Sequence, residues 1–319
     1  MTNNENNIWQ KFNVLSLFDG MSCWMIALNR AWIKVDVYYA SEIDKYATQV
    51  SKKHYPNIVR LWDINNWREW DLWEIDLIIW WSPCQWFSFA WKQLAFDDPR
   101  SKLFFTMVDI INHYSPKYFL LENVKMKKEF QNIITKYMWV EPIEINSALV
   151  SAQNRKRLYW TNIPWVQQPQ DKLILLKDIL EDEVDEKYFM TIQQFRNLWF
   201  ESLQRLYFEK APTLSTMQWW HRQPKILCNL YNQRIMIEKS WTLWTGQWFT
   251  NKQWYQVIEW KHRIRKLTPI ECERLQTLPD NYTEWVSNSQ RYKMIGNWWT
   301  VDIISHILWW LTTQSDNIL

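Results

Sequence analysis

The sequence predicts an α/β fold, with a largely parallel sheet that carries helices on both of its faces. Short apolar runs rich in β-branched residues alternate with segments of helical periodicity in the amino-terminal part of the chain. The first run, Asn13 to Phe18, is followed by Asp19-Gly20 and a helical pattern over about residues 22–31, the order that opens nucleotide-binding sheets. Polar and reactive side chains follow the ends of successive runs, where such sheets bind their ligands.

Length and composition fit a large domain with a smaller one attached. The chain has 319 residues, 22% of them charged, and a formal net charge of +3. This mild basicity allows a nucleic-acid partner without requiring one. The four cysteines show neither a CxxC pair nor a metal-ligand spacing, so we expect no disulfide framework, no metal site and a reducing, cytoplasmic compartment. With no signal-peptide pattern and no apolar run of membrane-spanning length, we expect no membrane association.

The stretch with the strongest chemical signal is Ser82-Pro83-Cys84-Gln85. An apolar run over residues 75–79 ends just before it, which places Cys84 on a loop beyond a strand, as a nucleophile would be placed. A lone cysteine is more often a small buried hydrophobic residue, so this stretch alone leaves both interpretations open.

Acidic residues follow two of the expected strands. Glu42 comes after the run at residues 35–40. Its carboxylate is equally consistent with binding the ribose of a nucleotide and with capping the helix expected over residues 44–54. Asp63 follows the run at residues 59–61, where a solvated loop residue is the commoner alternative.

Two further polar groups stand near expected strands. Glu122 ends the buried run at residues 118–121, either as a desolvated acid with a raised pKa or as a structural cap for the next helix. Gln153, Arg155 and Arg157 alternate, so on a strand they would share one face and could receive an anionic or carbonyl-bearing substrate. An exposed basic strand is the commoner alternative.

The second half of the chain is less regular. Between residues 165 and 262 the periodicity is poor, with helices expected only over residues 172–180 and 192–209, which indicates a separate small domain of loops and short strands. Regular patterning resumes with a helix from Thr268 to Gln276, whose first residues form a capping box. The apolar helix at residues 303–311 is expected to pack on the first domain.

Tryptophan and glycine are present in abnormal numbers. The chain has 27 tryptophans and 3 glycines, whereas ordinary usage gives glycine about 7% of residues, on the order of 22 here. Several tryptophans stand where chains use glycine for positive φ, tight turns or helix ends. These are Trp32 after a helical segment, Trp80 and Trp81 at a strand end, and Trp241, Trp244 and Trp248 in a polar loop.

In this order, the motifs resemble the DNA cytosine-5 methyltransferase family from about residue 13 to residue 310, least clearly between residues 166 and 262. The resemblance is carried by LFDG at Leu17–Gly20, SPCQ with the following FSFAWKQ, LENV at Leu121–Val124, QNRKR at Gln153–Arg157, RKLTPIECERLQTLP at Arg265–Pro279 and IGNWWTV at Ile295–Val301. It implies the Rossmann-like sheet of class I methyltransferases, with a catalytic domain at residues 1–164 and 263–319 and a target-recognition domain at residues 165–262.

The resemblance also implies the chemistry. Cys84, as a thiolate, would attack carbon 6 of cytosine, and Glu122 would stabilise the adduct through a proton at ring nitrogen N3. Arg155 and Arg157 would hold the carbonyl of the base. The cytosine would be flipped out of the duplex, because its ring atoms are inaccessible there. The residues implied to contact the DNA substrate are Gln85, Ser88 and Gln153.

S-adenosylmethionine is the implied methyl donor. Phe18 would pack on its adenine, Glu42 would bind its ribose and Asp63 its adenine amino group. The remaining implied cofactor positions are Gly20, Ile43, Ile64, Pro83, Leu103 and Asn297. The implied partner is double-stranded DNA, the implied assembly is a monomer, and a cognate restriction endonuclease would act separately.

The chain departs from this family at glycine positions, where it has tryptophan: Trp24, Trp62, Trp80, Trp81, Trp91 and Trp298. By contrast, Trp67, Trp160 and Trp299 look ordinary. A large side chain at a backbone-critical glycine costs about 1–3 kcal/mol per site, so the chain as written is expected not to fold into an active enzyme. We hypothesise that UGA codons for glycine have been read as tryptophan, which would spare only the 3 glycines present. A deliberately substituted chain is the alternative.

Two other functions compete with DNA methylation. A methyltransferase-like DNA-binding protein without catalysis would keep the fold, but the intact set of Cys84, Glu122, Arg155 and Arg157 argues against it. Methylation of RNA by the same chemistry is weakened by the SPCQ motif and by the downstream recognition segment.

Overall fold

The computed structural model describes residues 11–81, 99–189, 210–211, 225–229 and 262–313. Contacts along the chain divide it into two units. The sheet unit comprises Met1–Asn146, Lys156–Gln170 and Val301–Leu319, and the second unit comprises Ser147–Arg155 and Asp171–Thr300. The expected target-recognition domain at residues 165–262 stays a prediction, because most of it lies outside the described residues.

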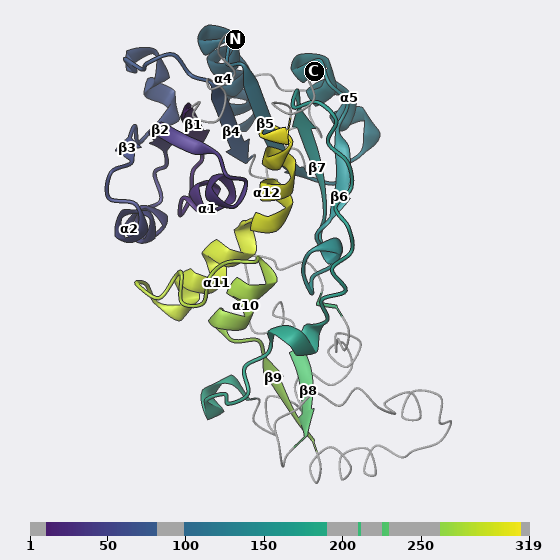
Figure 1. Ribbon diagram of the computed structural model, residues 1–319. Helices are drawn as coiled ribbons and strands as arrows, with labels where there is room; N and C mark the ends of the chain where they lie inside the picture. The colour runs from purple at the N-terminus through teal and green to yellow at the C-terminus, as the bar shows by residue number, and fades with distance from the viewer. Residues whose placement is uncertain (1–10, 82–98, 190–209, 212–224, 230–261, 314–319) are drawn as a thin grey trace, which may run out of the picture. The chain divides into compact units, whose positions relative to one another are not determined.

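The sheet unit is built on seven strands in the order β3-β2-β1-β4-β5-β7-β6 (Figure 1). The five strands from β3 to β5 are parallel to their neighbours, whereas β7 is antiparallel to both β5 and β6. The bounds are β1 Lys11–Leu17, β2 Lys34–Ser41, β3 Val59–Arg60, β4 Leu77–Trp81, β5 Tyr118–Val124, β6 Ile143–Asn146 and β7 Lys156–Thr161. β4 reads as a continuous apolar run because the sheet is covered on both faces.

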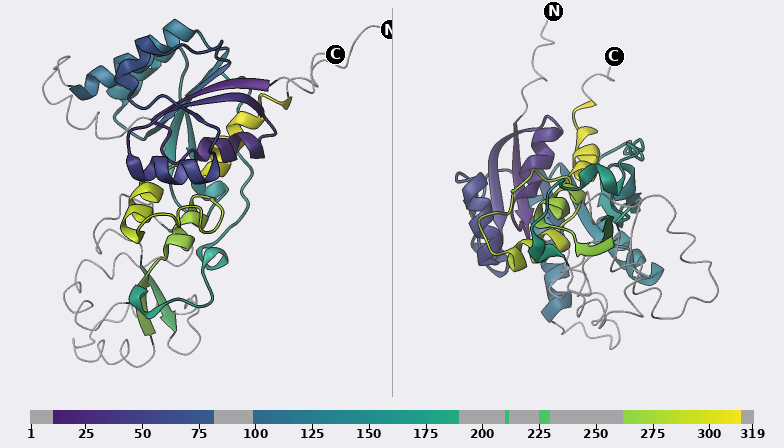
Figure 2. Two further views of the ribbon diagram at one scale, coloured as in Figure 1. Left: turned by 90° about the vertical axis from the view of Figure 1, so that its left-hand side faces the viewer. Right: turned by 90° about the horizontal axis from the view of Figure 1, so that it is seen from below.

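Helices cover both faces of this sheet (Figure 2, left view). On one face, α4 (Pro99–Tyr114), α5 (Lys128–Met138) and the 3₁₀ helix η1 (Ile64–Glu69) pack over alternate strand residues such as Leu17, Trp80 and Leu121. On the other face lie α1 (Cys23–Arg30), α2 (Lys45–His54) and α12 (Val301–Trp309), with α12 against α1. The predicted α/β sheet with helices on both faces is confirmed, as is the packing of the last helix on it.

The second unit has its own apolar core. It contains the 3₁₀ helices η2 (Ser147–Leu149), η3 (Leu176–Ile179) and η4 (Glu186–Tyr188), the antiparallel strands β8 (Lys225–Asn229) and β9 (His262–Lys266), and the helices α10 (Pro269–Leu275) and α11 (Asn288–Asn297). The buried residues that form this core are Ala152, Leu176, Ile179, Tyr188, Phe189, Ala211, Leu267, Cys272, Leu275, Tyr292 and Ile295.

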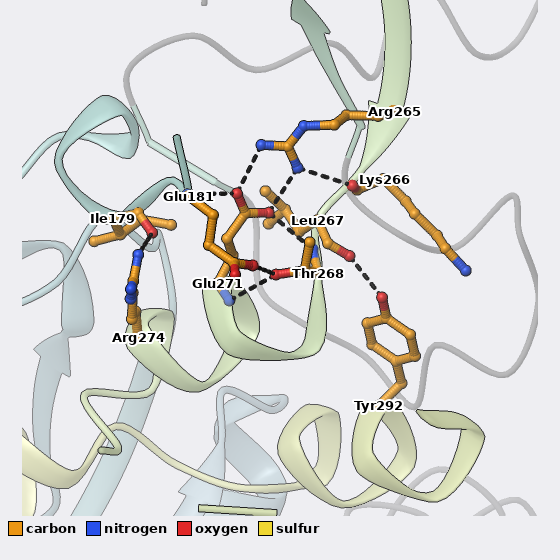
Figure 3. Close-up of polar contacts among 9 residues, drawn as sticks. All are labelled: Ile179, Glu181, Arg265, Lys266, Leu267, Thr268, Glu271, Arg274 and Tyr292. Atoms are coloured by element: carbon orange, nitrogen blue, oxygen red, sulfur yellow. Dashed lines mark hydrogen bonds and ion pairs between the residues drawn. The ribbon is translucent and has the colours of Figure 1, made fainter. Parts of the chain in front are cut away.

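A buried ion pair ties β9 to α10 in the second unit (Figure 3). Arg265 donates through both Nη atoms to the two carboxylate oxygens of Glu271, each at 2.7 Å, and both side chains are fully buried. The same oxygens accept from the backbone N–H of Thr268 at 2.8 Å and of Glu181 at 3.0 Å. The capping box predicted at Thr268 is therefore confirmed, and its glutamate also neutralises a buried arginine.

The expected elements mostly agree with the observed ones, with clear exceptions. The helix predicted over residues 172–180 is wrong, because only the short 3₁₀ helix η3 forms there. The helix predicted over residues 192–209 lies outside the described residues. α5 and α11 were not anticipated. Within the part of the chain that the structure describes, no helix is both long and apolar enough to cross a membrane.

Removing the guanidinium of Arg265 should strongly destabilise the protein. Arg265→Met leaves the Glu271 carboxylate buried without its counter-charge, which costs about 3–5 kcal/mol. Adding Glu271→Gln should recover at least about 1 kcal/mol, because the uncompensated charge is gone while an acceptor for Thr268 remains. The free energy of unfolding in urea, followed by circular dichroism, measures both.

Arg274→Met is the matched control for this experiment. Arg274 pairs with Asp280 at 2.6 Å in the same unit, but both side chains are partly exposed, so its loss should cost no more than about 1–2 kcal/mol. If the two arginine variants lost the same free energy of unfolding, the buried ion pair would contribute no more to stability than the partly exposed one.

Candidate active site

The carboxyl ends of β1, β2 and β3 meet at one edge of the sheet and are joined by backbone contacts. The N–H of Asp19 donates to the carbonyl of Ser41 at 3.0 Å, and the N–H of Leu61 donates to that of Ala40 at 2.8 Å. The hydroxyl of Ser41 donates to the carbonyl of Trp62 at 2.8 Å. The loops that carry the predicted cofactor residues therefore form one continuous surface, as expected at the carboxyl edge of a parallel sheet.

Glu42 links two of these loops. Its carboxylate accepts from the N–H of Gly20 at 2.8 Å and from the N–H of Asp44 at 2.7 Å. Asp44, rather than Glu42, caps α2, because its side chain accepts from the N–H groups of Tyr46 and Ala47. The helix-capping interpretation of Glu42 is thus wrong. Burial raises the pKa of Glu42, and the two N–H donors oppose that shift.

A buried carboxylate beneath this loop was not anticipated as a functional residue. Asp19 is 1% exposed and accepts hydrogen bonds from the hydroxyls of Tyr38, at 2.6 Å, and Ser22. Ser22 also lies 2.6 Å from the hydroxyl of Ser51, to which Arg60 donates at 3.0 Å. The network joins elements far apart in the sequence. The only local signal is the position of Asp19 beside the glycine of the first turn.

Burial changes the pKa values of the titratable groups in this network. It raises the pKa of Asp19, and the hydrogen bonds from Ser22 and Tyr38 offset only part of the shift. Burial, followed by the charge of Asp19, raises the pKa of Tyr38 well above its usual value. Tyr38 therefore stays a phenol that donates to the carboxylate, which fixes the shape of the loop between β1 and α1.

The remaining predicted cofactor residues occupy varied environments. Phe18 has φ 57 and packs against the core of the sheet unit. Asp63 caps η1 and accepts from Asn65, so it is more than a solvated loop residue. Ile43 is 74% exposed, whereas Ile64 is buried in the core and Leu103 packs on it. Asn297 is the last residue of α11, in the second unit.

Glu122 and Arg157 form a buried ion pair between β5 and β7. Glu122 lies within β5, fully buried, with Trp81 of β4 and Tyr159 of β7 as its neighbours in register. The Nε of Arg157, on β7, is 3.1 Å from its Oε1. The interpretation of Glu122 as a cap for the next helix is wrong, because its carboxylate pairs with Arg157 while α5 begins after Lys127. Its predicted desolvation is confirmed.

The three polar residues of the QNRKR motif do not share a strand. Only Arg157 lies on β7, which begins at Lys156. Gln153 forms an isolated bridge with Ala211, because the backbone of Ala152 and Asn154 hydrogen-bonds to that residue instead of extending the sheet. The prediction of one shared face is therefore wrong.

Gln153 and Arg155 are nevertheless both buried in the second unit. Arg155 donates to the carbonyl of Trp298. Among the described residues, neither polar atom of the Gln153 amide has a hydrogen-bond partner. A buried amide is costly unless a partner satisfies it, and none of the described residues does so for Gln153.

The predicted catalytic loop lies outside the described residues, and with it Pro83, Cys84, Gln85 and Ser88. Two other cysteines, Cys23 and Cys272, are buried. Burial raises the pKa of the Cys272 thiol well above its usual value, so this residue is a poor source of thiolate.

Comparison with known proteins agrees with this arrangement. The sequence profile of the family described as C-5 cytosine-specific DNA methylase matches residues 12–311. The chain is 31% identical over 317 residues to the type II methyltransferase M1.ScrFI of Lactococcus lactis subsp. cremoris, covering 92% of this chain and 76% of that protein. It is 26% identical over 427 residues to the orphan methyltransferase M.SPRI of Bacillus phage SPR, covering 93% and 96%.

Solved structures show the same fold. The methyltransferase EhMeth of Entamoeba histolytica superimposes with a TM-score of 0.72 at 17% sequence identity, over 96% of this chain and 99% of that one. At this identity the likeness concerns the fold alone. The profile match, however, spans almost the whole sequence and includes every motif described above. The chain therefore belongs to the C-5 cytosine-specific DNA methylase family.

Proposed function

We propose that this protein is a DNA cytosine-5 methyltransferase that modifies a flipped-out cytosine within a specific DNA sequence, and that its active form carries glycine where the sequence has tryptophan at the glycine positions of the family. The observation that carries the proposal is the family match over residues 12–311, which includes the motifs around Cys84, Glu122 and Arg157. The buried pair of Glu122 and Arg157 supports it, because a desolvated carboxylate held by a cation is a costly arrangement that is typical of functional sites.

The chemistry assigns a separate task to each side chain. The thiolate of Cys84 adds to carbon 6 of cytosine and makes carbon 5 nucleophilic. Glu122 holds a proton at ring nitrogen N3 while the adduct exists, and Arg155 and Arg157 hold the base carbonyl. After methylation a base takes the proton from carbon 5, the electron pair of that bond re-forms the double bond between carbons 5 and 6, and the carbon–sulfur bond breaks to restore the thiolate. When bound, S-adenosylmethionine would supply the methyl group and leave as S-adenosylhomocysteine.

The sheet register brings the nucleophile's segment to the carboxylate. Trp81, the last residue of β4, is the neighbour of Glu122 in β5. Cys84 follows Trp81 by three residues, a span of about 10 Å in an extended chain. The pairing of Trp81 with Glu122 supports a short separation between the proposed nucleophile and the proposed acid, although Cys84 itself lies outside the described residues.

The carboxyl edge formed by β1, β2 and β3 fits S-adenosylmethionine. Both oxygens of Glu42 already accept one backbone N–H, but a carboxylate offers about four lone-pair sites and can still accept from ribose hydroxyls. Phe18 offers a ring for the adenine, and Asp63 an acceptor for its amino group. Gly20, Ile43, Ile64, Pro83, Leu103 and Asn297 are the further proposed contacts.

The proposed partner is double-stranded DNA, read by a target-recognition domain at residues 165–262, with Gln85, Ser88 and Gln153 contacting the substrate. The buried amide of Gln153 supports its share of this role. One relative is named a type II methyltransferase and another an orphan phage methyltransferase. We therefore propose a restriction-modification or phage role for a monomer, and any cognate endonuclease would act separately.

A covalent complex with DNA that contains 5-fluorocytosine tests the nucleophile. The reaction ends when a base removes the proton from carbon 5, and a fluorine atom in place of that proton blocks this step. In the presence of S-adenosylmethionine, the adduct with Cys84 should therefore persist on a denaturing gel. Cys84→Ser should abolish the band and Cys272→Ser should keep it, because Cys272 is buried. The test uses protein with glycine at the substituted positions; if this protein binds the DNA but forms no adduct, the result would support the non-catalytic alternative.

Glu122→Gln should lower the rate of methyl transfer by about 10²–10⁴-fold, because the amide cannot exchange a proton with N3. Binding of S-adenosylmethionine, measured by calorimetry, should change little. Glu144→Gln is the matched control: this glutamate is on β6 and pairs with Lys125 at the surface. An unchanged rate in Glu122→Gln would exclude Glu122 from the chemistry.

The pH dependence of stability tests the buried Asp19. Since burial raises its pKa in the folded protein above the ordinary 3.8, the folded state binds the proton more tightly than the unfolded chain. Its stabilising contribution is full below pH 3.8 and is lost as pH rises through the folded pKa. Wild type should therefore lose stability relative to Asp19→Asn as pH rises from about 4 to 7, measured by urea unfolding.

Asp36→Asn controls for the general loss of a negative charge, because Asp36 is half exposed and pairs with Lys11. A difference between wild type and Asp19→Asn that stays constant with pH would contradict the buried-carboxylate interpretation.

A further inference from the structure

The backbone places several tryptophans in a conformation that suits glycine. Ten described residues other than glycine have positive φ, and four of them are tryptophans: Trp32 (φ 60), Trp62 (φ 61), Trp139 (φ 60) and Trp165 (φ 65). No other residue type occurs more than twice among the ten. In this left-handed region a Cβ atom crowds the backbone, so bulky residues rarely adopt it.

Trp32 occupies the glycine position of a Schellman motif at the end of α1. The N–H of Ile33 donates to the carbonyl of Leu28, and the N–H of Trp32 donates to the carbonyl of Asn29, both at 3.0 Å. These are the two hydrogen bonds that define the motif, and its left-handed residue is usually glycine. Ile33 and Leu28 are both buried, which completes the apolar contact that accompanies it.

Trp139 and Trp165 occupy a helix cap and a turn, two further positions at which glycine is usual. Trp139 ends α5 in the left-handed conformation, and its N–H donates to the carbonyl of Thr135 at 2.8 Å, the single bond of a left-handed helix cap. Trp165 follows Pro164 in a turn. In a type II turn proline precedes a residue with positive φ, which is generally glycine.

The indole rings at these positions contribute little to the fold. The side chains of Trp32, Trp139 and Trp165 are 83%, 88% and 76% exposed. Trp62 is half exposed, with the amine of Lys52 at 5.2 Å from its ring. An exposed contact of this kind is worth little.

Other tryptophans use their side chains fully. The Nε1 of Trp160, which is buried, donates to the hydroxyl of Thr135 at 3.0 Å. Trp67 is buried under the guanidinium of Arg68, 4.4 Å from its ring, and against the ring of His113. These six tryptophans therefore fall into two groups: the rings of Trp67 and Trp160 pack in the fold, whereas Trp32, Trp62, Trp139 and Trp165 stand where the backbone favours glycine.

We infer that glycine occupies positions 32, 62, 139 and 165 in the protein as its own cells make it, because those cells read UGA as glycine. UGA differs from the glycine codon GGA only in its first base and from the tryptophan codon UGG only in its last. A single anticodon change can therefore move it to either amino acid. The same reassignment explains the coexistence of 27 tryptophans with 3 glycines. Trp67 and Trp160 keep UGG and remain tryptophan.

Tandem mass spectrometry of the protein isolated from cells that carry the gene tests this directly. Peptides that span the ends of α1 and α5 should show the residue mass of glycine at positions 32 and 139. Peptides from η1 and β7 should show that of tryptophan at positions 67 and 160. The codons should agree, with UGA at the first two positions and UGG at the other two. Tryptophan at position 32 or 139 of the isolated protein would overturn the inference.

Single variants of the chain as written test the backbone argument without the native source. Trp32→Gly and Trp139→Gly should each raise the urea midpoint, because they relieve a left-handed Cβ and remove an exposed ring. Trp73→Gly is the matched control: Trp73 is 74% exposed but does not have positive φ, so it should lower the midpoint. An equal or greater rise in the control, or a fall in both left-handed variants, would overturn the argument.

Discussion

The pairing of β5 with β7 depends on the buried ion pair between Glu122 and Arg157. Removing two charges from water is expensive, so the pair is stable only when the geometry brings the charges together. In the antiparallel ladder of β5 and β7, Glu122 lies opposite Tyr159, and Arg157 lies diagonally, opposite Val124. A slip of one residue would turn one charge to the other face of the sheet and leave both unpaired. The proposed acid of the reaction thus also fixes the register between β5 and the antiparallel strand β7.

The loop after β1 also gives up some stability in order to hold its residues in fixed positions. Asp19 would be more stable in water, yet it is enclosed beneath the turn that carries Gly20 and held by Tyr38 from the neighbouring strand. The hydrogen bonds compensate for burial only in part, which is why its pKa remains raised. What the protein gains is a loop in which the N–H of Gly20 already donates to Glu42. If this surface binds the proposed cofactor, it is pre-organised at a cost in stability that the rest of the sheet must offset.

Local signals in the sequence predicted most of the sheet and part of the candidate site. The capping box at Thr268 depends on residues within one turn, and the strand that ends at Trp81 is a continuous apolar run, so both could be found without tertiary knowledge. The partner of Glu122 could not, because Arg157 is distant in sequence and the residues just before its strand, around Gln153, pair with Ala211 instead.

The amphipathic spacing of Phe130, Ile134 and Met138 would have revealed α5, whose end is disguised by a tryptophan at its cap. The helix expected over residues 172–180 failed because an apolar pattern says nothing of the tertiary contacts that confine it to a 3₁₀ turn.

The tryptophans at left-handed positions also determine in which organisms the gene can be translated into a functional protein. If their codons are UGA, a recipient cell that treats UGA as a stop ends translation no later than position 32, just after the first helix. A recipient that inserts tryptophan makes a full-length chain with large apolar rings at helix ends that should face water, a surface prone to aggregation. A DNA methylase gene of this kind could be exchanged usefully only among organisms that share one genetic code. The helix caps of this protein would then act as a barrier to gene transfer, without any change in its DNA specificity.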